Sequence, residues 1–237
     1  NAKNIVSICE NNKVNLGIVF QHRFRKSSIK LKSLISDNKF GQIFSAQINV
    51  PWWREQSYYD DPGRGTYERD GGGVLISQAI HTLDLAISLL GDVKEVMVMA
   101  ETTKFHKMES ENFVTGGIKF INGVIASLFA TTSVFPGSSE SIVLHCENAT
   151  VKLEAGTLII NWRNGKKEEF GEESGTGGSA DPMAFPFDWH KDLIINFAKS
   201  ISTNERFEIT GKEALKVHYL IDAMIESSKK NKLITME

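Results

Sequence analysis

The sequence lacks the features that mark membrane, secreted and nucleic-acid-binding proteins. Its apolar runs all fall short of the roughly 20 residues that a transmembrane helix needs, and its first residues lack the charged-then-apolar pattern of a signal peptide. Only two cysteines occur, Cys9 and Cys146, which favours a reduced, cytoplasmic compartment. A net charge of −2 leaves no electrostatic footprint for nucleic acid or an anionic membrane.

Several catalytic motifs are also missing. The chain has no Gly-x-Gly-x-x-Gly dinucleotide fingerprint, no Gly-x-x-x-x-Gly-Lys-Ser/Thr phosphate loop and no Gly-x-Ser-x-Gly nucleophile elbow. Its six histidines show no metal-ligand spacing with cysteines or carboxylates. The sequence therefore predicts an acid/base group without a metal or nucleophile, so its chemistry needs a cofactor or a partner domain.

The most informative stretch begins with Gly71-Gly72-Gly73 and continues as a largely apolar run to Leu90-Gly91. This pattern predicts a buried helix over residues 74–90 with Gly91 at its C-cap. The glycines place an open helix N-terminus shortly before His81, and such ends attract anions and electron-rich substrate atoms.

A polar stripe crosses this apolar helix. Polar groups on a buried face are costly unless they are used or satisfied, and histidine suits proton transfer near neutral pH. The alternative interpretation is a packing histidine whose ring is held by the nearby carboxylate of Asp84. The stripe consists of Ser77, His81, Asp84 and Ser88, with Gln78 and Thr82 beside it.

The rest of the chain divides into two parts. Residues 1–21 read as a helix followed by a buried strand at 14–20, the tail of an α/β dinucleotide-binding domain. Residues 22–237 predict an α+β domain with a large, mostly antiparallel sheet of six to eight strands and helices on one face. Ser27 or Ser28 is expected to cap its first helix. The other sheet face is expected to carry Val96, Val98, Ile125, Ser127 and Phe129.

If that second face is apolar, a second subunit should cover it, giving a homodimer or homotetramer.

The segment 51–69 is long, irregular and rich in aromatic and arginine side chains, which is typical of a functional loop. Tyr59, Arg54 and Arg64 are suited to stacking on a ring or holding a carboxylate or phosphate. A packed surface loop with aromatic anchors is an equally good interpretation of this segment.

Together these motifs resemble the glucose–fructose oxidoreductase/inositol dehydrogenase (Gfo/Idh/MocA) family over essentially the whole chain. The resemblance rests on Gly71 to Gly91, on Phe20-Gln21-His22-Arg23-Phe24, on Phe40-Gly41-Gln42-Ile43 and on the hairpin Phe120-Ile121-Asn122-Gly123-Val124. Members place a Rossmann domain before an open-faced sheet domain, which implies that the first domain is truncated here.

The resemblance implies an NAD- or NADP-dependent oxidoreductase that acts on a sugar, polyol or nucleotide-sugar hydroxyl. It implies His81 as the acid/base, while the family's catalytic lysine lies outside this sequence. Many members have an aspartate where Ser77 stands, which leaves an assisting carboxylate in doubt. It further implies substrate contacts from Ser77, Gln78, Tyr59, Arg54, Arg64 and His190, and cofactor contacts from Gln21 and Arg23.

Within the family, the sequence is most similar to the branch that oxidises UDP-N-acetylhexosaminuronates at the 3-position, on the basis of Tyr58-Tyr59, Arg64-Gly65-Thr66 and Gln78. Arg64 or Arg54 would then hold the uronate carboxylate or the diphosphate. Two other functions stay open: a non-catalytic sugar-binding or scaffold protein, and a lyase or hydrolase that uses bound NAD as a transient redox aid.

Overall fold

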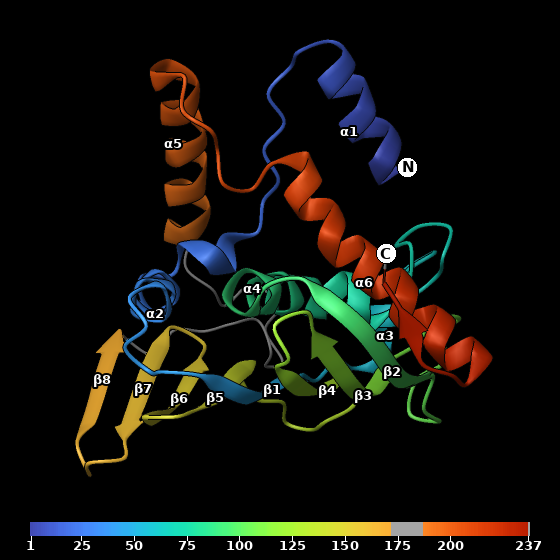
Figure 1. The fold of residues 1–237 in the computed structure, drawn as a ribbon. Helices are drawn as coiled ribbons and strands as arrows, with labels where there is room; N and C mark the ends of the chain where they lie inside the picture. Colours follow the sequence, from blue (N-terminus) through green and yellow to red (C-terminus); the bar gives the residue numbers. More distant parts are fainter. Residues whose placement is uncertain (172–186, 237) are drawn as a thin grey trace.

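The computed structural model describes residues 1–171 and 187–236, and in this part of the chain a nine-stranded sheet lies under a layer of helices (Figure 1). The strand order is β8-β7-β6-β5-β1-β4-β3-β2-β9, and β1–β4 is the one parallel pair that the described residues form. The predicted α+β class and mostly antiparallel sheet are confirmed. The strands are β1 (Ile43–Pro51), β2 (Val93–Glu101), β3 (Phe113–Phe120), β4 (Ile125–Thr131), β5 (Ser141–Cys146), β6 (Ala149–Glu154), β7 (Thr157–Trp162), β8 (Lys167–Gly171) and β9 (Ile234–Thr235).

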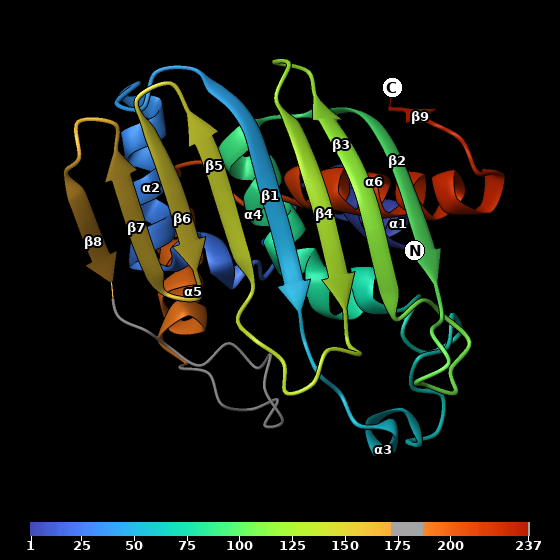
Figure 2. The same ribbon diagram turned by 90° about the horizontal axis from the view of Figure 1, so that it is seen from below.

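The helices lie on one side of this sheet, as Figures 1 and 2 show together. Helices α2, α4 and α6 rest directly over the strands, whereas α1 and α5 rise away from them (Figure 1). The described helices are α1 (Ala2–Asn11), the 3-10 turn η1 (Gln21–Phe24), α2 (Lys26–Ser36), α3 (Gln56–Tyr59), the π-turn η2 (Leu75–Ala79), α4 (Ile80–Leu90), α5 (Asp188–Thr203) and α6 (Gly211–Lys230). No helix in the described ranges is long and apolar enough to cross a membrane.

Alternating side chains of the central strands form the core beneath the helices. In β1, for example, Ala46, Ile48 and Val50 are buried while the residues between them face away from the helices. The same side of β2 holds Val96 and Val98, so their predicted position on the open face is wrong. Each pairs across the ladder with the helix-facing side of β3, at Ile118 and Gly116.

The open face of the sheet is apolar over β2 and β4, as predicted for Ile125, Ser127 and Phe129. Ile125 is 58% exposed. Met97 and Met99, which stand on either side of Val98 in β2, are 51% and 58% exposed. Strand β3 separates these side chains, because Met97 and Met99 pair with Gly117 and Thr115 of β3, whereas Ile125 pairs with Lys119.

Of the predictions at the helix ends, the one for Gly91 holds and the one for Ser27 or Ser28 fails. Gly91 follows α4 with φ +92, and the Thr210 hydroxyl accepts from the backbone N–H of Glu213 at the start of α6. In contrast, α2 begins at Lys26 with Arg25 as its N-cap, and no side chain caps it. Ser27 therefore lies inside the first turn rather than at the cap.

The predicted buried strand over residues 14–20 is not formed. Only Gly17 pairs there, in a single antiparallel bridge with Thr210, and Val14 and Val19 are 59% and 43% exposed. An isolated extended segment cannot become a buried strand without neighbours that pair with its backbone. The helix before it, α1, matches the predicted one.

Candidate active site

Gly73 allows a close contact with Glu111, which closes the helix start that the three glycines were expected to leave open. The Glu111 carboxylate accepts hydrogen bonds from the backbone N–H groups of Gly73 (3.2 Å) and Leu75 (3.1 Å), and its carbonyl accepts one from Val74 (2.8 Å). An anion of the protein itself thus occupies this helix terminus. The predicted anion-binding role of the glycine turn is therefore wrong.

Gly73 is a position where only glycine fits. A Cβ at this residue would lie 1.8 Å from the backbone oxygen of Glu111, whereas a Cβ at Gly117 would meet its nearest atom at 3.9 Å. We expect Gly73→Ala to lower the unfolding free energy by about 1–3 kcal/mol or more through overpacking. The matched variant Gly117→Ala should leave it nearly unchanged, and equal urea midpoints for the two variants would contradict this contact.

His81 lies one residue into α4, directly after the π-turn η2. Its ring packs edge-on against Phe20 (centroids 5.8 Å apart) and against the tilted ring of His22 (5.3 Å). The side chain is partly exposed, and its Nδ1 atom is buried without a hydrogen-bond partner among the described residues. A π-turn often marks a functional site, because it shifts the side chains that follow it.

Asp84 does not hold the His81 ring. Both of its oxygens accept from Arg23, with Nε–Oδ2 at 2.7 Å and Nη2–Oδ1 at 2.6 Å, and the pair is buried. Burial would lower the pKa of Arg23, but the hydrogen bond and charge of Asp84 outweigh it and raise that pKa. The expectation that Asp84 holds the His81 ring is therefore wrong, and the carboxylate instead joins η1 to α4.

The groups that surround His81 come from η1, α2, α5 and the segment before β5. Arg25 lies with its guanidinium 4.4 Å from the ring centroid of Trp189, and its Nη1 is 2.7 Å from Glu140 Oε1. His22 Nε2 is 3.9 Å from the same oxygen. The charge of His190 also acts on both His22 and His81.

This environment keeps His81 neutral. Burial, followed by the charges of Arg25 and His190, lowers the pKa of His81 to about 4. Burial and the charge of Arg25 likewise hold the pKa of His22 well below its usual range. Above about pH 4 the His81 imidazole is therefore mostly neutral, which is the protonation state that a general base requires.

Buried polar atoms without hydrogen-bond partners are concentrated here. In native proteins such atoms are few, and each one calls for an explanation. Most of those found in the described residues lie on η1, the start of α2 and the facing side of η2 and α4. They belong to Gln21, His22, Arg25, Ser27, Ser28, Gln78, His81, Thr82 and Ser88. The concentration indicates a surface that meets polar groups of a ligand or another domain.

The structure thus brings together His81, Gln78, His190, Gln21 and Arg23 from the predicted site. Gln78 is buried, with its Oε1 unpartnered in the described structure, while Ser77 is exposed. Their roles toward substrate or cofactor stay predictions.

The arginines and tyrosines of the 51–69 loop form a separate cluster. Tyr59 Oη lies 2.8 Å from Thr132 Oγ1, and burial raises the pKa of Tyr59 to about 12. Arg64 stacks on Tyr58 with 4.2 Å to the ring centroid, and Arg54 donates to the carbonyl of Trp53. In the described structure, no hydrogen bond, ion pair or ring contact joins Tyr59 or Arg64 to His81.

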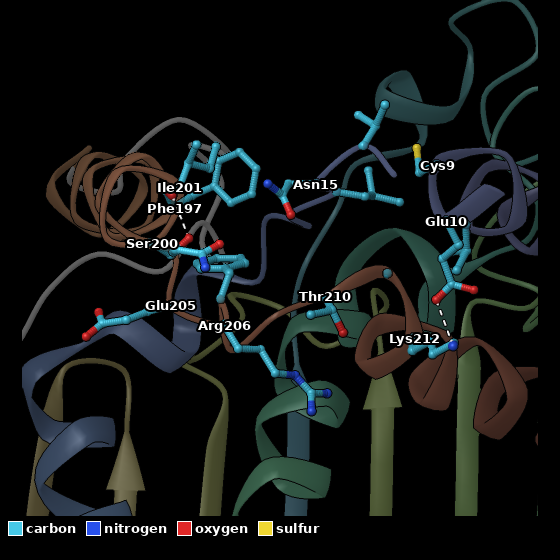
Figure 3. A pocket seen from close by; sticks show the side chains of 16 residues that line it. Cys9, Glu10, Asn15, Phe197, Ser200, Ile201, Glu205, Arg206, Thr210 and Lys212 are labelled. Atoms are coloured by element: carbon cyan, nitrogen blue, oxygen red, sulfur yellow. Dashed lines mark hydrogen bonds and ion pairs between the residues drawn. The ribbon is translucent and has the colours of Figure 1, made fainter. Parts of the chain in front are cut away.

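A cavity of about 220 Å³ between α1 and the chain connecting α5 to α6 is also distinct from this site (Figure 3). Phe197 and Ile201 form part of its wall, and Glu10 pairs with Lys212 at 2.8 Å on its rim. Neither His81 nor Arg25 lines it. Within the described ranges no group of three or more histidine, cysteine or carboxylate side chains could hold a metal.

Sequence reasoning missed Glu111, Arg25, Glu140 and a site role for His22. Arg25 and His22 flank the recognised Arg23-Phe24 pair, so their proximity to the site was a usable signal. Glu111 and Glu140 are far from His81 in sequence and carry no local pattern that marks them.

Comparison with known proteins gives concordant results. The family model for the Gfo/Idh/MocA C-terminal domain matches residues 28–152. The protein YMR315W of Saccharomyces cerevisiae is 24% identical over 243 residues, which cover 97% of this chain and 66% of the relative. This chain thus spans about two thirds of the length of that relative.

Two solved structures are similar over the whole chain. The WlbA dehydrogenase of Bordetella pertussis, in complex with NADH and UDP-GlcNAcA, is 25% identical with a TM-score of 0.81, and the match covers 67% of that protein. The WlbA dehydrogenase of Chromobacterium violaceum, with the same ligands, is 27% identical with a TM-score of 0.78, again over 67% of its length. The matched domain and these neighbours show that this chain belongs to the Gfo/Idh/MocA oxidoreductase family, as an example of its C-terminal domain.

Proposed function

We propose that the chain is the substrate-binding and oligomer-forming part of an NAD(P)-dependent dehydrogenase that acts on a hydroxyl of a sugar, polyol or nucleotide sugar. His81 is its acid/base. The observation that carries the proposal is a neutral, partly exposed His81 set among buried polar atoms without partners. The NADH and UDP-sugar complexes of the WlbA neighbours support the same class of reaction.

Residues 1–21 are proposed to be the end of a dinucleotide-binding domain. In support, α1 stands away from the sheet (Figure 1), and its Ile5 and Ile8 are 53% and 61% exposed. An apolar helix face of this kind is suited to packing against another domain. The remainder of the cofactor site, including the catalytic lysine of the family, would lie in that domain.

The residues of η1 fit contact with a nicotinamide rather than with phosphates. Gln21 Oε1 is a buried acceptor that lacks a partner in the described structure, which suits an amide donor. Arg23, the other predicted cofactor residue, uses its Nε and Nη2 on Asp84. When bound, NAD or NADP supplies the hydride acceptor.

The chain's own residues handle the proton and the substrate hydroxyls. In the oxidative direction, the neutral His81 imidazole takes the proton of the hydroxyl as the hydride leaves the carbon that bears this hydroxyl. The reductive direction is the reverse of this step, with the His81 imidazolium as the acid. Gln78 Oε1 accepts a hydrogen bond from a neighbouring hydroxyl.

The apolar part of the open sheet face is proposed to bind a second copy of the chain. Met97, Met99 and Ile125 are each more than half exposed, and they lie on β2 and β4, the two strands on either side of β3. Burial of such a surface against its own copy is the usual arrangement in symmetric oligomers.

A substrate screen tests the dehydrogenase assignment. The complete encoded protein is incubated with NAD or NADP and with UDP-sugar acids, inositols or free hexoses, and we expect reduced cofactor to accumulate with at least one substrate. The 237-residue chain alone is expected not to bind NADH tightly. Tight NADH binding by this chain would contradict the domain assignment.

Two further outcomes identify the alternative functions. Sugar binding without turnover by the complete protein would indicate a sensor or scaffold. Product formation without net NADH would indicate a lyase or hydrolase that uses the cofactor transiently.

A further inference from the structure

Arg25 has one edge of its guanidinium engaged and the other unused. Its Nη1 lies 2.7 Å from Glu140 Oε1 and donates to the Ala155 carbonyl at 2.9 Å. Its Nε and Nη2 are buried without a hydrogen-bond partner among the described residues. Buried donors on a charged group are costly to leave unsatisfied, so this edge calls for an acceptor.

The neighbouring Arg23 shows what such an edge binds. In Arg23 the same two atoms, Nε and Nη2, donate to the two oxygens of Asp84 at 2.7 and 2.6 Å. These N–H groups are parallel, and their spacing matches the two oxygens of a carboxylate. In the described structure no carboxylate takes this position on Arg25, because Glu140 meets Nη1 instead.

The surroundings of this edge are also suited to an anion. Arg25 is the N-cap of α2, whose first helical bond runs from Ile29 N–H to the Arg25 carbonyl, so the amides of the first turn precede any intrahelical bond. The Ser27 and Ser28 hydroxyls in that turn are buried and likewise lack a partner in the part described. Helix N-termini favour negative charge.

We propose that Arg25, with the first turn of α2, binds the carboxylate of a sugar-acid substrate beside His81. This inference rests on the proposed dehydrogenase function and names its substrate class. Trp189 covers one face of the guanidinium at 4.4 Å, whereas the N–H donors lie in the guanidinium plane, at the buried edge that lacks a partner in the described structure.

The position next to His81 argues for a carboxylate on the reacting sugar. The charge of Arg25 acts on both His22 and His81, so the guanidinium lies near the proposed base. A group held by Arg25 while His81 meets a ring hydroxyl therefore belongs to the same sugar. Arg25 is thus proposed for the carboxylate-binding role that the sequence suggested for Arg54 or Arg64, and Arg64 stacks on Tyr58 in the separate loop cluster.

Tryptophan fluorescence offers a test that does not depend on turnover, because Trp189 contacts Arg25. The complete protein is titrated with UDP-N-acetylglucosaminuronate and with UDP-N-acetylglucosamine, which differ in the carboxylate, and with glucuronate and glucose. We expect each acid to bind at least about 10-fold more tightly than its neutral partner, as for hydrogen bonds to a charged group.

Three variants locate the preference. Arg25→Met should abolish it, but this variant leaves Glu140 buried without its partner and can fail to fold. Arg25→Lys keeps a charge opposite Glu140 while losing the paired donors, and it should reduce the preference by about 10-fold. Arg163→Met, at an exposed arginine in the β7–β8 turn, should leave it unchanged.

The outcomes separate this inference from the dehydrogenase assignment. Failure of the wild type to bind the acids, equal affinity for acid and neutral sugars, or full preference in Arg25→Lys would overturn the carboxylate site. Binding of UDP alone that depends on Arg25 would assign the residue to the diphosphate and also overturn it. A preference for acids without cofactor reduction would leave the site in place and contradict the dehydrogenase.

Discussion

Replacement of His81 by asparagine in the complete protein should lower kcat by about 10²- to 10⁴-fold, the usual contribution of a general acid/base. We expect this loss because His81 is a neutral and partly exposed imidazole that lies among buried polar atoms of η1 and α4 without hydrogen-bond partners in the described structure. Asparagine keeps a polar side chain of similar reach but cannot take the proton. Cofactor reduction under saturating substrate measures the loss.

A matched control uses a histidine on the opposite face of the sheet. His145 lies in β5 with its side chain away from the helices, and His145→Asn should retain kcat within a few-fold. Comparable losses in the two variants, or near-normal turnover in His81→Asn, would contradict the assigned role.

The pH dependence of kcat/KM is a second test of His81. Burial and the charge of Arg25 lower the pKa of His81 to about 4. His81 therefore stays deprotonated as the pH falls from 6.5, the usual pKa of histidine, to about 4. The acid limb of kcat/KM for oxidation should therefore fall near pH 4 to 5 rather than near 6.5. The same shift makes folding weaker in acid, since the unfolded chain binds the proton from about pH 6.5 downward and the folded chain only near pH 4.

Much of the architecture was predictable because its signals are local. The Asn122-Gly123 pair joins β3 to β4 with Gly123 at φ +93, and the glycine at the end of α4 also adopts a positive φ. The phase of β2 was not predictable, because Val96, Met97, Val98 and Met99 are all apolar. With both faces of the strand apolar, alternation cannot tell the core side from the open side.

The site was predictable only in part, for a related reason. A polar stripe on an apolar helix identifies His81 as a candidate from the sequence alone. The groups that determine the chemistry of His81, however, come from segments that are distant in the sequence. Glu111 closes the helix start from 38 residues away, and Glu140 meets Arg25 across more than a hundred residues. Nothing in the local sequence says that Asp84 pairs with Arg23 rather than with His81, because that choice is made by how η1 packs on α4.

Loss of the Asp84 carboxylate should have the largest effect on stability. In Asp84→Ala the Arg23 guanidinium would remain buried without the carboxylate that pairs with it. Removal of one partner of such a buried pair lowers the unfolding free energy by about 3–5 kcal/mol. Glu208, whose Oε1 is 3.5 Å from Arg23 Nη1, is half-exposed and offers only partial compensation. Urea unfolding should show the loss, whereas Glu154→Ala, which breaks the exposed Lys152–Glu154 pair, should cost less than about 1 kcal/mol.

Removal of both charges distinguishes a stabilising pair from a positioning one. Because the penalty in Asp84→Ala comes from the unpaired guanidinium, the double variant Arg23→Met/Asp84→Leu should recover most of the stability. It should not recover activity, since the bidentate contact orients η1, and η1 carries Gln21 and His22 against His81. A stable double variant with normal kcat would show that hydrophobic packing alone places η1, and a single variant as stable as Glu154→Ala would show that the pair contributes nothing to the fold.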